Sequence, residues 1–424
     1  MLNFRQTNSL HGKPALRNCR AGFFAFVCLL LTGVSMPALA SSPANTGLFA
    51  TANTAETAYL NPAGMTRLEG SHKTLQGILV YSFAEFEVDE DQTSVDGGDP
   101  DTDNSPIIIP GFYYTRQLND EWWFGISANI PSGFGSDYGD DWAGRYYSDQ
   151  YTLVYVGLNP SLAYRLNDKW SLGLGANINY TYSLSENSVN TPGSDTPDGR
   201  AEFEGDGFAF GGSVSALYEL NDRTRFGIVY SSEVSTDVDG ELKVKGASLP
   251  PQLNAVGSGN QKADITVENI LPQRLQAGLY HEFSSGNYLT IDGAWIDFSE
   301  FATGAVTIQD SVEVAPEGIY DDIWAINAGY GVPLGNGRTL KFGALYVSNA
   351  VNDENRTLSL RLDSIWGVGT GMSFEKGDRL LDMNLNLYYL GKAPVDTGFN
   401  PVQGRVVGET SNPWAVALDV AWHW

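Results

Sequence analysis

The sequence holds only two cysteines, Cys19 and Cys28, and both lie near its start. The rest of the chain therefore has no disulfide bond to stabilise it and no thiolate for nucleophilic or metal chemistry. Basic residues are scarce as well, with 25 Lys and Arg against 50 Asp and Glu, and the formal net charge is −25. This balance argues against a nucleic-acid partner, because phosphate binding needs clustered Lys and Arg.

Long apolar runs are also few. Ala21–Met36 is an uncharged apolar stretch that follows several basic residues and ends in Ala38-Leu39-Ala40. A basic region, an apolar region and a small-residue cleavage site together predict a signal peptide over residues 1–40. An N-terminal membrane anchor is the alternative, but the run is shorter than the roughly 18 residues of a span. No second run of that length follows, so no membrane helix is predicted in the mature chain.

Alternation of apolar and polar residues is the most regular feature of the remaining sequence. In Ser171–Leu184 every even position is apolar, and every odd position is Gly, Asn, Ser or Thr. Leu381–Tyr389 and Val416–Trp424 alternate in the same way, with apolar faces free of charge. A period of two predicts β-strands. The alternation continues for the roughly 9–11 residues that a transmembrane strand needs, which is longer than an ordinary strand.

Connections between these strands are of two lengths. The short ones are Asn119–Glu121, Asn167–Lys169, Asn221–Thr224, Ser284–Asn287, Leu334–Arg338 and Glu375–Asp378. The long ones are Asp89–Ser105, Gly133–Gln150, Ser185–Gly205, Gly240–Ile270, Thr303–Tyr320, Val351–Leu360 and Pro394–Asn412. This alternation predicts an all-β, 14-stranded antiparallel transmembrane β-barrel with short periplasmic turns and long external loops.

Three of the short turns share one motif, Leu-Asn-Asp followed by a charged residue, at Leu118–Glu121, Leu166–Lys169 and Leu220–Arg223. We expect its Asn and Asp to supply the backbone freedom for chain reversal. Aromatic residues crowd the strand ends, as at Trp122-Trp123 and Tyr388-Tyr389, which is typical of interfacial girdles. A soluble β-sandwich is the alternative fold, but it explains neither the length of the alternation nor the crowded aromatics.

Residues 41–72 do not alternate, and they contain a short motif, Asn61-Pro62-Ala63-Gly64-Met65. This motif resembles the NPAGM element of the FadL/TodX family of outer-membrane transporters for long-chain fatty acids and aromatic hydrocarbons. Other segments resemble the family in the same order, namely Asp140–Tyr146, Leu158–Tyr182, Gly205–Leu220, Tyr230–Val234, Leu271–Gly278 and Asp353–Phe374. The resemblance implies an N-terminal hatch over residues 41–72, folded inside a barrel over residues 73–424.

The resemblance also implies a transport mechanism. A hydrophobic ligand is captured by external loops, enters an apolar pocket and leaves sideways into the membrane through a kink in the third strand. The third strand is expected at Trp122–Ile130. It runs directly into Pro131, Ser132, Gly133, Phe134 and Gly135. Proline cannot donate to the strand ladder and glycine weakens it, so strand pairing is expected to fail there. A strand that simply ends where its loop begins is the alternative.

A fatty-acid carboxylate calls for an interior cation, and Arg145 and Arg356 are the candidates; structural ion pairs are their alternative role. The first long loop is strongly acidic, with Glu87, Asp89, Glu90, Asp91, Asp96, Asp99, Asp101 and Asp103. Its Asp99-Pro-Asp-Thr-Asp103 run fails as a calcium loop, because Asn104 replaces the required glycine and strands flank it. No metal site and no cofactor are therefore predicted. Divalent ions shared with lipopolysaccharide are the alternative to a solvated loop.

Catalytic motifs are absent from the sequence, and we predict that the protein is not an enzyme. His72, His281 and His423 remain after processing, with no Gly-x-Ser-x-Gly elbow and no His/Cys metal spacing. We expect a monomer in the outer membrane of a Gram-negative bacterium that carries hydrophobic small molecules and contacts membrane lipid and lipopolysaccharide. The terminal Trp424 resembles the aromatic residue that the barrel-assembly machinery recognises. Passive transport of long-chain fatty acids is the first expectation; an aromatic-hydrocarbon channel, a nonspecific porin and an inert structural barrel or adhesin are the alternatives.

Overall fold

A computed structural model describes residues 42–424 except 102–103, 192–196, 248–260, 310–311 and 315–317. The predicted signal peptide, residues 1–40, lies outside the described residues. In the described part of the chain, no helix is both long and apolar enough to cross a membrane. Strands make up most of this part, as the alternation predicts.

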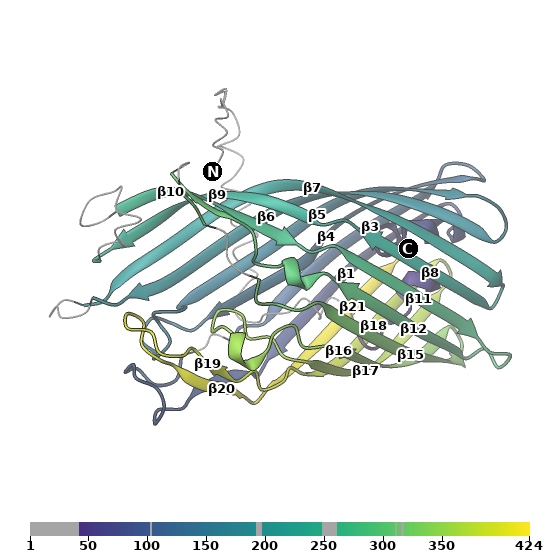
Figure 1. Ribbon diagram of the computed structural model, residues 1–424. Coiled ribbons are helices and arrows are strands. Elements are labelled where there is room, and N and C mark those ends of the chain that lie inside the picture. The colour runs from purple at the N-terminus through teal and green to yellow at the C-terminus, as the bar shows by residue number, and fades with distance from the viewer. Residues whose placement is uncertain (1–41, 102–103, 192–196, 248–260, 310–311, 315–317) are drawn as a thin grey trace, which may run out of the picture. The chain divides into compact units, whose positions relative to one another are not determined.

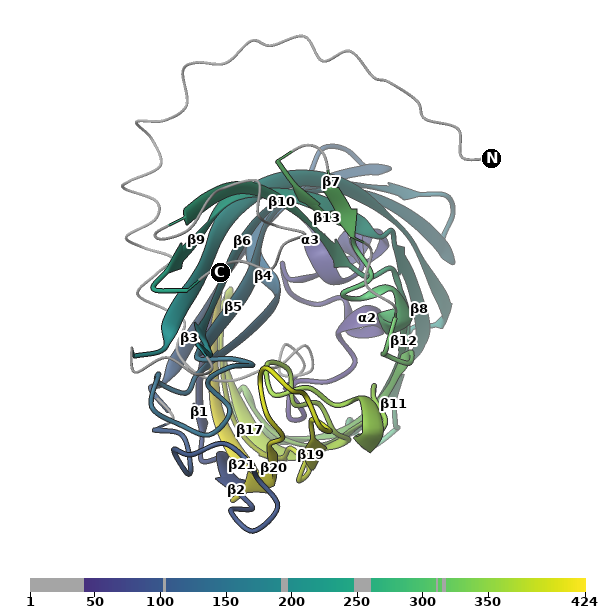
Figure 2. The ribbon, with the colours of Figure 1, turned by 60° about the vertical axis from the view of Figure 1, so that its left-hand side comes forward.

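The described strands form one large sheet that closes on itself (Figures 1 and 2). Eighteen of them belong to this sheet, and fourteen of these form the closed ring. In chain order the ring consists of β1 (Ser71–Ser82), β3 (Ile107–Gln117), β4 (Trp122–Asp137), β5 (Gln150–Arg165), β6 (Trp170–Val189), β7 (Gly199–Asn221), β8 (Thr224–Ser231), β11 (Arg274–Glu282), β12 (Tyr288–Ile296), β15 (Ile323–Gly335), β16 (Arg338–Val347), β17 (Ile365–Lys376), β18 (Arg379–Tyr389) and β21 (Trp414–His423). Each strand pairs antiparallel with the next, and β1 pairs with β21 to close the ring. The predicted 14-stranded barrel is confirmed.

Two of the long loops contain strands that were not expected. Residues 232–271 and 303–320 contain β9 (Val234–Lys245), β10 (Gln261–Leu271), β13 (Val306–Ile308) and β14 (Val312–Val314), which extend the sheet beside β7. The long loops predicted at Gly240–Ile270 and Thr303–Tyr320 therefore contain strands that the sequence analysis did not predict. β6 and β7 run for 20 and 23 residues, about twice what a membrane crossing needs. Their projecting ends expose backbone donors and acceptors, and β9 pairs with this part of β7.

A smaller sheet joins the first and the last long loops. It consists of β2 (Glu85–Val88), β19 (Val395–Asp396) and β20 (Val407–Ser411). Five short helices complete the described structure, namely α2 (Leu48–Thr51), α3 (Thr57–Leu60), η2 (Pro62–Arg67), η4 (Phe298–Glu300) and η5 (Asp353–Asn355). The first three belong to residues 42–70, which contact the inner side of the barrel wall. Figure 2 shows α2 and α3 within the ring of strands.

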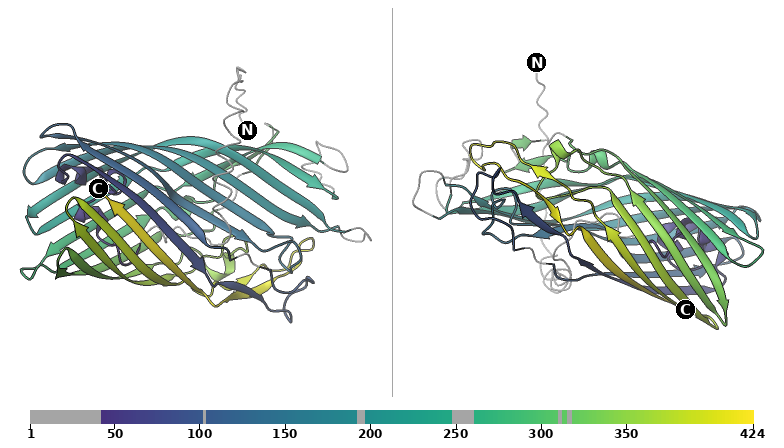
Figure 3. Two further views of the ribbon diagram at one scale, coloured as in Figure 1. Left: turned by 180° about the vertical axis from the view of Figure 1, so that it is seen from behind. Right: turned by 90° about the horizontal axis from the view of Figure 1, so that it is seen from below.

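The two faces of the barrel strands follow the alternation in the sequence. On β6 the apolar Leu174 is 62% exposed, whereas the inward Asn179 is 2% exposed. Exposure of the apolar face identifies it as the lipid-facing side. Aromatic pairs lie near both strand ends, such as Trp170 with Tyr218 beside a short turn and Tyr346 with Trp366 beside the long loops. Figure 3 shows the tilted strands from behind and from below.

The repeated Leu-Asn-Asp motif forms three turns, of which the first two are equivalent, and the mechanism differs from the expected one. Asn119 has an ordinary negative φ, and its side-chain Oδ1 accepts hydrogen bonds from the backbone N–H groups of Glu121 and Trp122, both 2.9 Å long. Asn167 accepts the corresponding bonds in the second turn. Each asparagine therefore satisfies donors that the reversal leaves unpaired, and left-handed backbone freedom is not used.

A buried ion-pair network ties together the strands where the ring closes. Lys341 Nζ lies 2.7 Å from Asp382 Oδ1, and both side chains are 7% exposed. Asp382 Oδ2 lies 3.1 Å from His423 Nε2, and His423 Nδ1 lies 2.8 Å from Thr74 Oγ1. These four residues belong to β16, β18, β21 and β1, so the network links the two ends of the barrel sequence.

We predict that Asp382→Asn destabilises the folded barrel by about 3 kcal/mol, because it leaves the Lys341 ammonium buried without a counter-ion. Urea unfolding in lipid vesicles, followed by tryptophan fluorescence, measures the change. Glu409→Gln is the matched control: it breaks the exposed Lys392–Glu409 pair and should change stability by less than about 0.5 kcal/mol. An unchanged unfolding midpoint for Asp382→Asn would contradict the assigned role.

Candidate functional site

Residues 42–70, here called the N-terminal segment, are held to the inner wall by hydrogen bonds. Ala44 N donates to Asn386 Oδ1 at 3.1 Å, and Gly47 N donates to Asp292 Oδ2 at 2.5 Å. Farther along, Ala63 N donates to Ser215 Oγ at 3.0 Å. The anchoring side chains come from β18, β12 and β7, on different sides of the barrel. The polar inner face of the strands therefore provides the docking surface for this segment.

The motif Asn61-Pro62-Ala63-Gly64-Met65 forms a buried turn at the end of the N-terminal segment. Asn61 is fully buried, and its Nδ2 donates to the carbonyl oxygen of Phe49 at 2.6 Å. Pro62 begins η2, where its missing N–H costs nothing. Met65 is also fully buried and packs with Trp123 on β4. The motif thus fixes the fold of the segment against the wall of the barrel.

The wall is made to fit this segment closely by inward-facing glycines. A Cβ atom on Gly227 would lie 1.9 Å from the carbonyl oxygen of Phe49, and one on Gly173 would lie 2.3 Å from the backbone nitrogen of Ala63. Both distances are far below van der Waals contact. Glycine on the polar face of these strands therefore allows the backbone of the segment to approach the backbone of the wall.

The third strand of the ring, β4, continues through the expected kink instead of ending there. It runs to Asp137, seven residues beyond the expected end at Ile130. Its pairing with β5 shifts register between Asn129 and Ser132, which inserts one extra residue at Ile130-Pro131 and makes a β-bulge. After the shift Phe134 points inward and is 3% exposed.

Pairing on the other side of β4 stops at the same place. β3 pairs with β4 only from Phe112 opposite Ala128 to the turn, while residues 107–111 of β3 pair with β1 alone. Proline lies on both sides of this gap, as Pro110 on β3 and Pro131 on β4. Neither can donate a backbone hydrogen bond, so the ladder between these two strands cannot continue. The wall is unpaired between residues 107–111 and 129–137.

An apolar cavity of about 170 Å³ lies between the N-terminal segment and this unpaired stretch. Residues from both sides of the gap line it: Ile109, Pro110, Asn129, Ile130 and Pro131. Leu48, Phe49, Tyr59 and Leu60 of the N-terminal segment line it as well, and the opposite wall is mostly aliphatic, with Ile296, Ile323, Leu345 and Val347. The cavity can therefore hold an apolar molecule directly behind the gap.

A second, smaller cavity of about 40 Å³ adjoins the first one on the side of the long loops and shares Pro131, Arg274 and Ile296 with it. Its lining includes four aromatic residues, Phe134, Tyr155, Phe298 and Phe301. Phe298 and Phe301 stack with ring centroids 4.6 Å apart, and Phe134 lies 5.2 Å from Phe301. These rings form an apolar lining between the external loops and the larger cavity.

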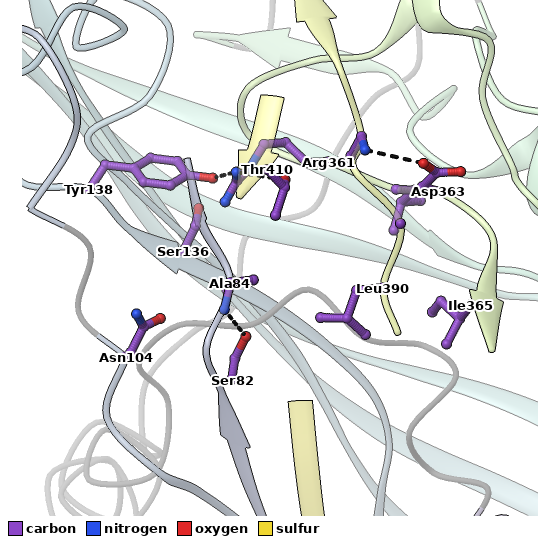
Figure 4. A pocket seen from close by; sticks show the side chains of 14 residues that line it. Ser82, Ala84, Asn104, Ser136, Tyr138, Arg361, Asp363, Ile365, Leu390 and Thr410 are labelled. Atoms are coloured by element: carbon purple, nitrogen blue, oxygen red, sulfur yellow. Dashed lines mark hydrogen bonds between the residues drawn. The ribbon is translucent and has the colours of Figure 1, made fainter. Parts of the chain in front are cut away.

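A third cavity, of about 70 Å³, lies among the long loops and the ends of β1 and β4 (Figure 4). Arg361 reaches into it, with Nε donating to Tyr138 Oη at 2.9 Å and an NH donating to Thr410 Oγ1 at 3.0 Å. Asp363 on the same loop accepts a hydrogen bond from Ala393 N at 3.1 Å. Three long loops are thus tied together around a small half-polar hollow.

The expected carboxylate contacts, Arg145 and Arg356, both lie in long loops and form structural ion pairs. Arg145 Nε lies 3.0 Å from Asp198 Oδ2. Arg356 NH1 lies 2.7 Å from Asp353 Oδ1, and its other nitrogens donate to backbone carbonyls such as that of Leu362. Neither arginine is among the residues that line the 170 Å³ cavity. The contacts of both correspond to the alternative role that the sequence left open.

Most residues of the cavity lining were not identified from the sequence, and Pro110 and Arg274 are two of them. Pro110 breaks a strand pattern, which was a usable signal. Arg274 has no local signal, because its surroundings come from strands and helices far apart in the chain. In the acidic first loop, Asp103 lies outside the described residues. Among the described residues, no three His, Cys, Asp or Glu side chains are placed together to hold a metal ion.

A closed barrel with an apolar outer face, an internal N-terminal segment and an apolar cavity behind a gap in its wall defines the class: an outer-membrane β-barrel with the form of a transporter. The chain belongs to the family described as outer membrane protein transport protein (OMPP1/FadL/TodX), whose model matches residues 31–420. The expected family membership is confirmed.

Individual relatives agree with this assignment. The chain is 26% identical over 344 residues to the long-chain fatty acid transport protein of Escherichia coli O6:H1, covering 73% of this chain and 72% of that protein. It is 24% identical over 281 residues to outer membrane protein P1 of Haemophilus influenzae, covering 56% and 59%. Among solved structures, a FadL homologue of Pseudomonas aeruginosa has a TM-score of 0.78 at 17% identity, covering 93% of this chain and 99% of that one. The toluene transporter TodX of P. putida has a TM-score of 0.64 at 17% identity, covering 87% and 93%. These two structures share the fold.

We predict that Gly227→Val displaces the N-terminal segment, because the added side chain overlaps the backbone of Phe49. A displaced segment opens a water path through the barrel, so single-channel conductance in planar bilayers should rise severalfold over the unmodified protein. Gly293→Val is the matched control, since a Cβ atom there meets nothing within 4 Å. Equal conductance for both variants would show that the segment does not depend on this contact.

Proposed function

We propose that the protein carries long-chain fatty acids passively across the outer membrane, from capture at the external loops to lateral exit between β3 and β4. One observation carries the proposal: the apolar cavity is bounded on one side by the unpaired stretch of wall, and residues from both edges of the gap line it. A molecule in the cavity therefore lies close to the lipid, because no backbone hydrogen bonds join β3 and β4 at this part of the wall.

The chemistry of the interior supports a sideways exit over a straight one. Toward the short turns the barrel contains a polar cavity of about 250 Å³, lined by charged residues that include Glu56, Arg225, Lys341 and Asp382. An alkyl chain that entered this polar cavity would lose the favourable free energy of apolar burial, about 25 cal/mol per Å² of apolar surface. Leaving through the gap keeps the chain in an apolar environment throughout. Flow down a concentration gradient then needs no energy source.

The N-terminal segment acts in this proposal as the hatch of the barrel. Its hydrogen bonds to β7, β12 and β18 and its close packing at Gly173 and Gly227 hold it across the interior. The motif Asn61–Met65 is the fixed end of the hatch, and the part before it borders the apolar cavity. A hatch in this position hinders the passage of water and small solutes, which distinguishes the protein from a nonspecific porin.

Capture would begin at the aromatic rings near the long loops. Phe134, Phe298, Phe301 and Tyr320 cluster there, with Phe298 and Tyr320 5.4 Å apart. The same rings favour a second candidate function, uptake of aromatic hydrocarbons. The size of the main cavity agrees with this alternative, because apolar cavities of about 150 Å³ hold benzene in other proteins.

The remaining expectations belong to the same proposal. We expect no enzymatic activity: Thr74, His423 and Asp382 form a triad-like chain, but Thr74 is fully buried and Lys341 already pairs with the carboxylate. We also expect a monomer, surrounded by outer-membrane lipid and lipopolysaccharide, with no nucleic-acid partner. Insertion by the barrel-assembly machinery would use Trp424, whose backbone pairs with that of Lys73.

The direct test is uptake of labelled oleate by cells that lack their own fatty-acid transporter and express this protein. We predict uptake severalfold above cells with an empty vector, and heat-modifiable migration on a gel confirms that the barrel has folded. Uptake at the background level by a folded barrel would contradict the fatty-acid proposal. Labelled toluene, tested in the same cells, would then decide whether the aromatic alternative holds.

A further inference from the structure

Arg274 is the one basic residue among those that line the apolar cavity, and it also lines the smaller aromatic cavity beside it. It stands at the start of β11, and Pro131 and Ile296 are the other two residues that both linings share. The two cavities adjoin at this shared lining. A charged group there is placed to contact a molecule that moves from one cavity to the other.

The guanidinium of Arg274 is poorly satisfied within the described structure. One NH2 group donates to Tyr59 Oη at 2.6 Å, and no described carboxylate lies within ion-pair distance. Its Nε is buried and has no hydrogen-bond partner. Arg145, Arg356 and Lys341 each have an aspartate partner. Arg274 therefore differs from them in having unfilled donor capacity and an uncompensated charge.

Tyr59 adds a second donor at the same place. Its oxygen accepts the hydrogen bond from Arg274, which leaves the hydroxyl hydrogen free to donate to another group. Tyr59 belongs to the N-terminal segment and Arg274 to the wall, so the pair bridges the two. An anion between them could accept from the guanidinium and from the hydroxyl together, which is the geometry that carboxylates favour.

Burial of a cation in apolar surroundings without a counter-ion is unfavourable, so a structure keeps one there at a loss of stability. Glu56 also lines the cavity, but its carboxylate is 2% exposed and accepts from Thr54 Oγ1 at 2.7 Å. Burial raises the pKa of the Glu56 carboxyl. No hydrogen bond or ion pair joins this carboxyl to Arg274 in the described structure. The cavity is thus left with a cation that an anionic ligand can neutralise.

We propose that Arg274 and Tyr59 form a carboxylate-binding site, and that this site makes the cavity select apolar molecules with a carboxylate head over neutral hydrocarbons. The inference rests on the proposed function and deepens it by naming the chemical group that is recognised. A bound carboxylate gains charge-assisted hydrogen bonds, whereas a neutral hydrocarbon leaves the guanidinium unpaired. With the head fixed at Arg274, the tail lies along Ile130, Pro131 and Pro110, toward the gap.

The test compares two ligands with one tail: octanoate, and its neutral counterpart octanamide. Binding to the purified full-length mature protein in lipid nanodiscs is measured by isothermal titration, with empty nanodiscs subtracted. We expect octanoate to bind at least about tenfold more tightly than octanamide. Arg274→Met, which keeps the stem and removes the charge, should bring the two affinities to within about twofold. Tyr59→Phe, which removes one donor, should reduce the preference for octanoate severalfold.

Arg274→Lys and Arg379→Met serve as controls. Lysine keeps the charge without the planar fork, so it should restore part of the preference. Arg379 is exposed at the start of β18, and its loss should leave the preference unchanged. Equal binding of both ligands to the unmodified protein would overturn the inference, and so would a preference that survives Arg274→Met.

Failure of the inference and failure of the proposed function have different signatures. If oleate uptake is present but octanoate has no advantage, the carboxylate site is overturned and the transport function stands. If folded barrels give no oleate uptake, the fatty-acid function fails by itself. A preference for octanoate that depends on Arg274 would even then support the carboxylate site, with a different carboxylate as its cargo.

Discussion

Within a bilayer, every backbone N–H and C=O of the protein must find a partner in the chain, because lipid offers none. The structure meets this requirement by closing fourteen strands into a ring, and the closing contact between β1 and β21 is continuous. The missing backbone hydrogen bonds between β3 and β4 therefore reduce the stability of the barrel. Prolines at 110 and 131 reduce the cost, since each removes a donor that would otherwise be unpaired. The gap is therefore built into the sequence of the wall, and the cavity lies directly behind it.

Closure of the barrel also explains why the inner face of the strands is polar. Side chains that alternate inward have no lipid to meet, so they can be Gly, Asn, Ser and Asp. The same polar face holds the N-terminal segment through its backbone, and it supports an ion-pair network centred on Asp382. Apolar lining appears only in part of the interior, where the segment, the gap and the aromatic rings meet. Arg274 is the one basic residue among those that line this part of the interior.

Most of the barrel could be predicted from sequence, because a period of two and the alternation of short and long connections report directly on strands and their order. The kink was expected from Pro131 for the same local reason. The strands within residues 232–271 could not be foreseen, since β9 forms by pairing with the projecting end of β7 and β10 forms by pairing with β9. Pairing of this kind depends on neighbours distant in the chain. Turn residues such as Asn119 were correctly placed, but the bonding of their side chains became visible only with coordinates.

Prediction of the site was weaker for a physical reason. Arg145 and Arg356 have no feature in the sequence that separates them from other loop arginines. Only the structure shows that their guanidinium groups already bind aspartates and backbone carbonyls. Arg274 is a candidate site residue because it lines a cavity. Residues of β3, β4, β11, β12 and the N-terminal segment form that cavity together. A chain read residue by residue does not contain that information. The guanidinium of Arg274 is notable because no described carboxylate pairs with it. No sequence motif marks a residue that lacks such a partner.

The measurement that most directly tests lateral exit is reversible closure of the gap. Gly111 and Asn129 would form the next pair if the ladder between β3 and β4 continued, and residues 41–424 contain no native cysteine to interfere. In Gly111→Cys/Asn129→Cys, oxidation should abolish oleate uptake and a reductant should restore it. Tyr114→Cys/Ile126→Cys, a pair already in register on the lipid side, should transport equally in both states. Undiminished uptake with the Gly111/Asn129 disulfide fully formed would contradict exit through this gap.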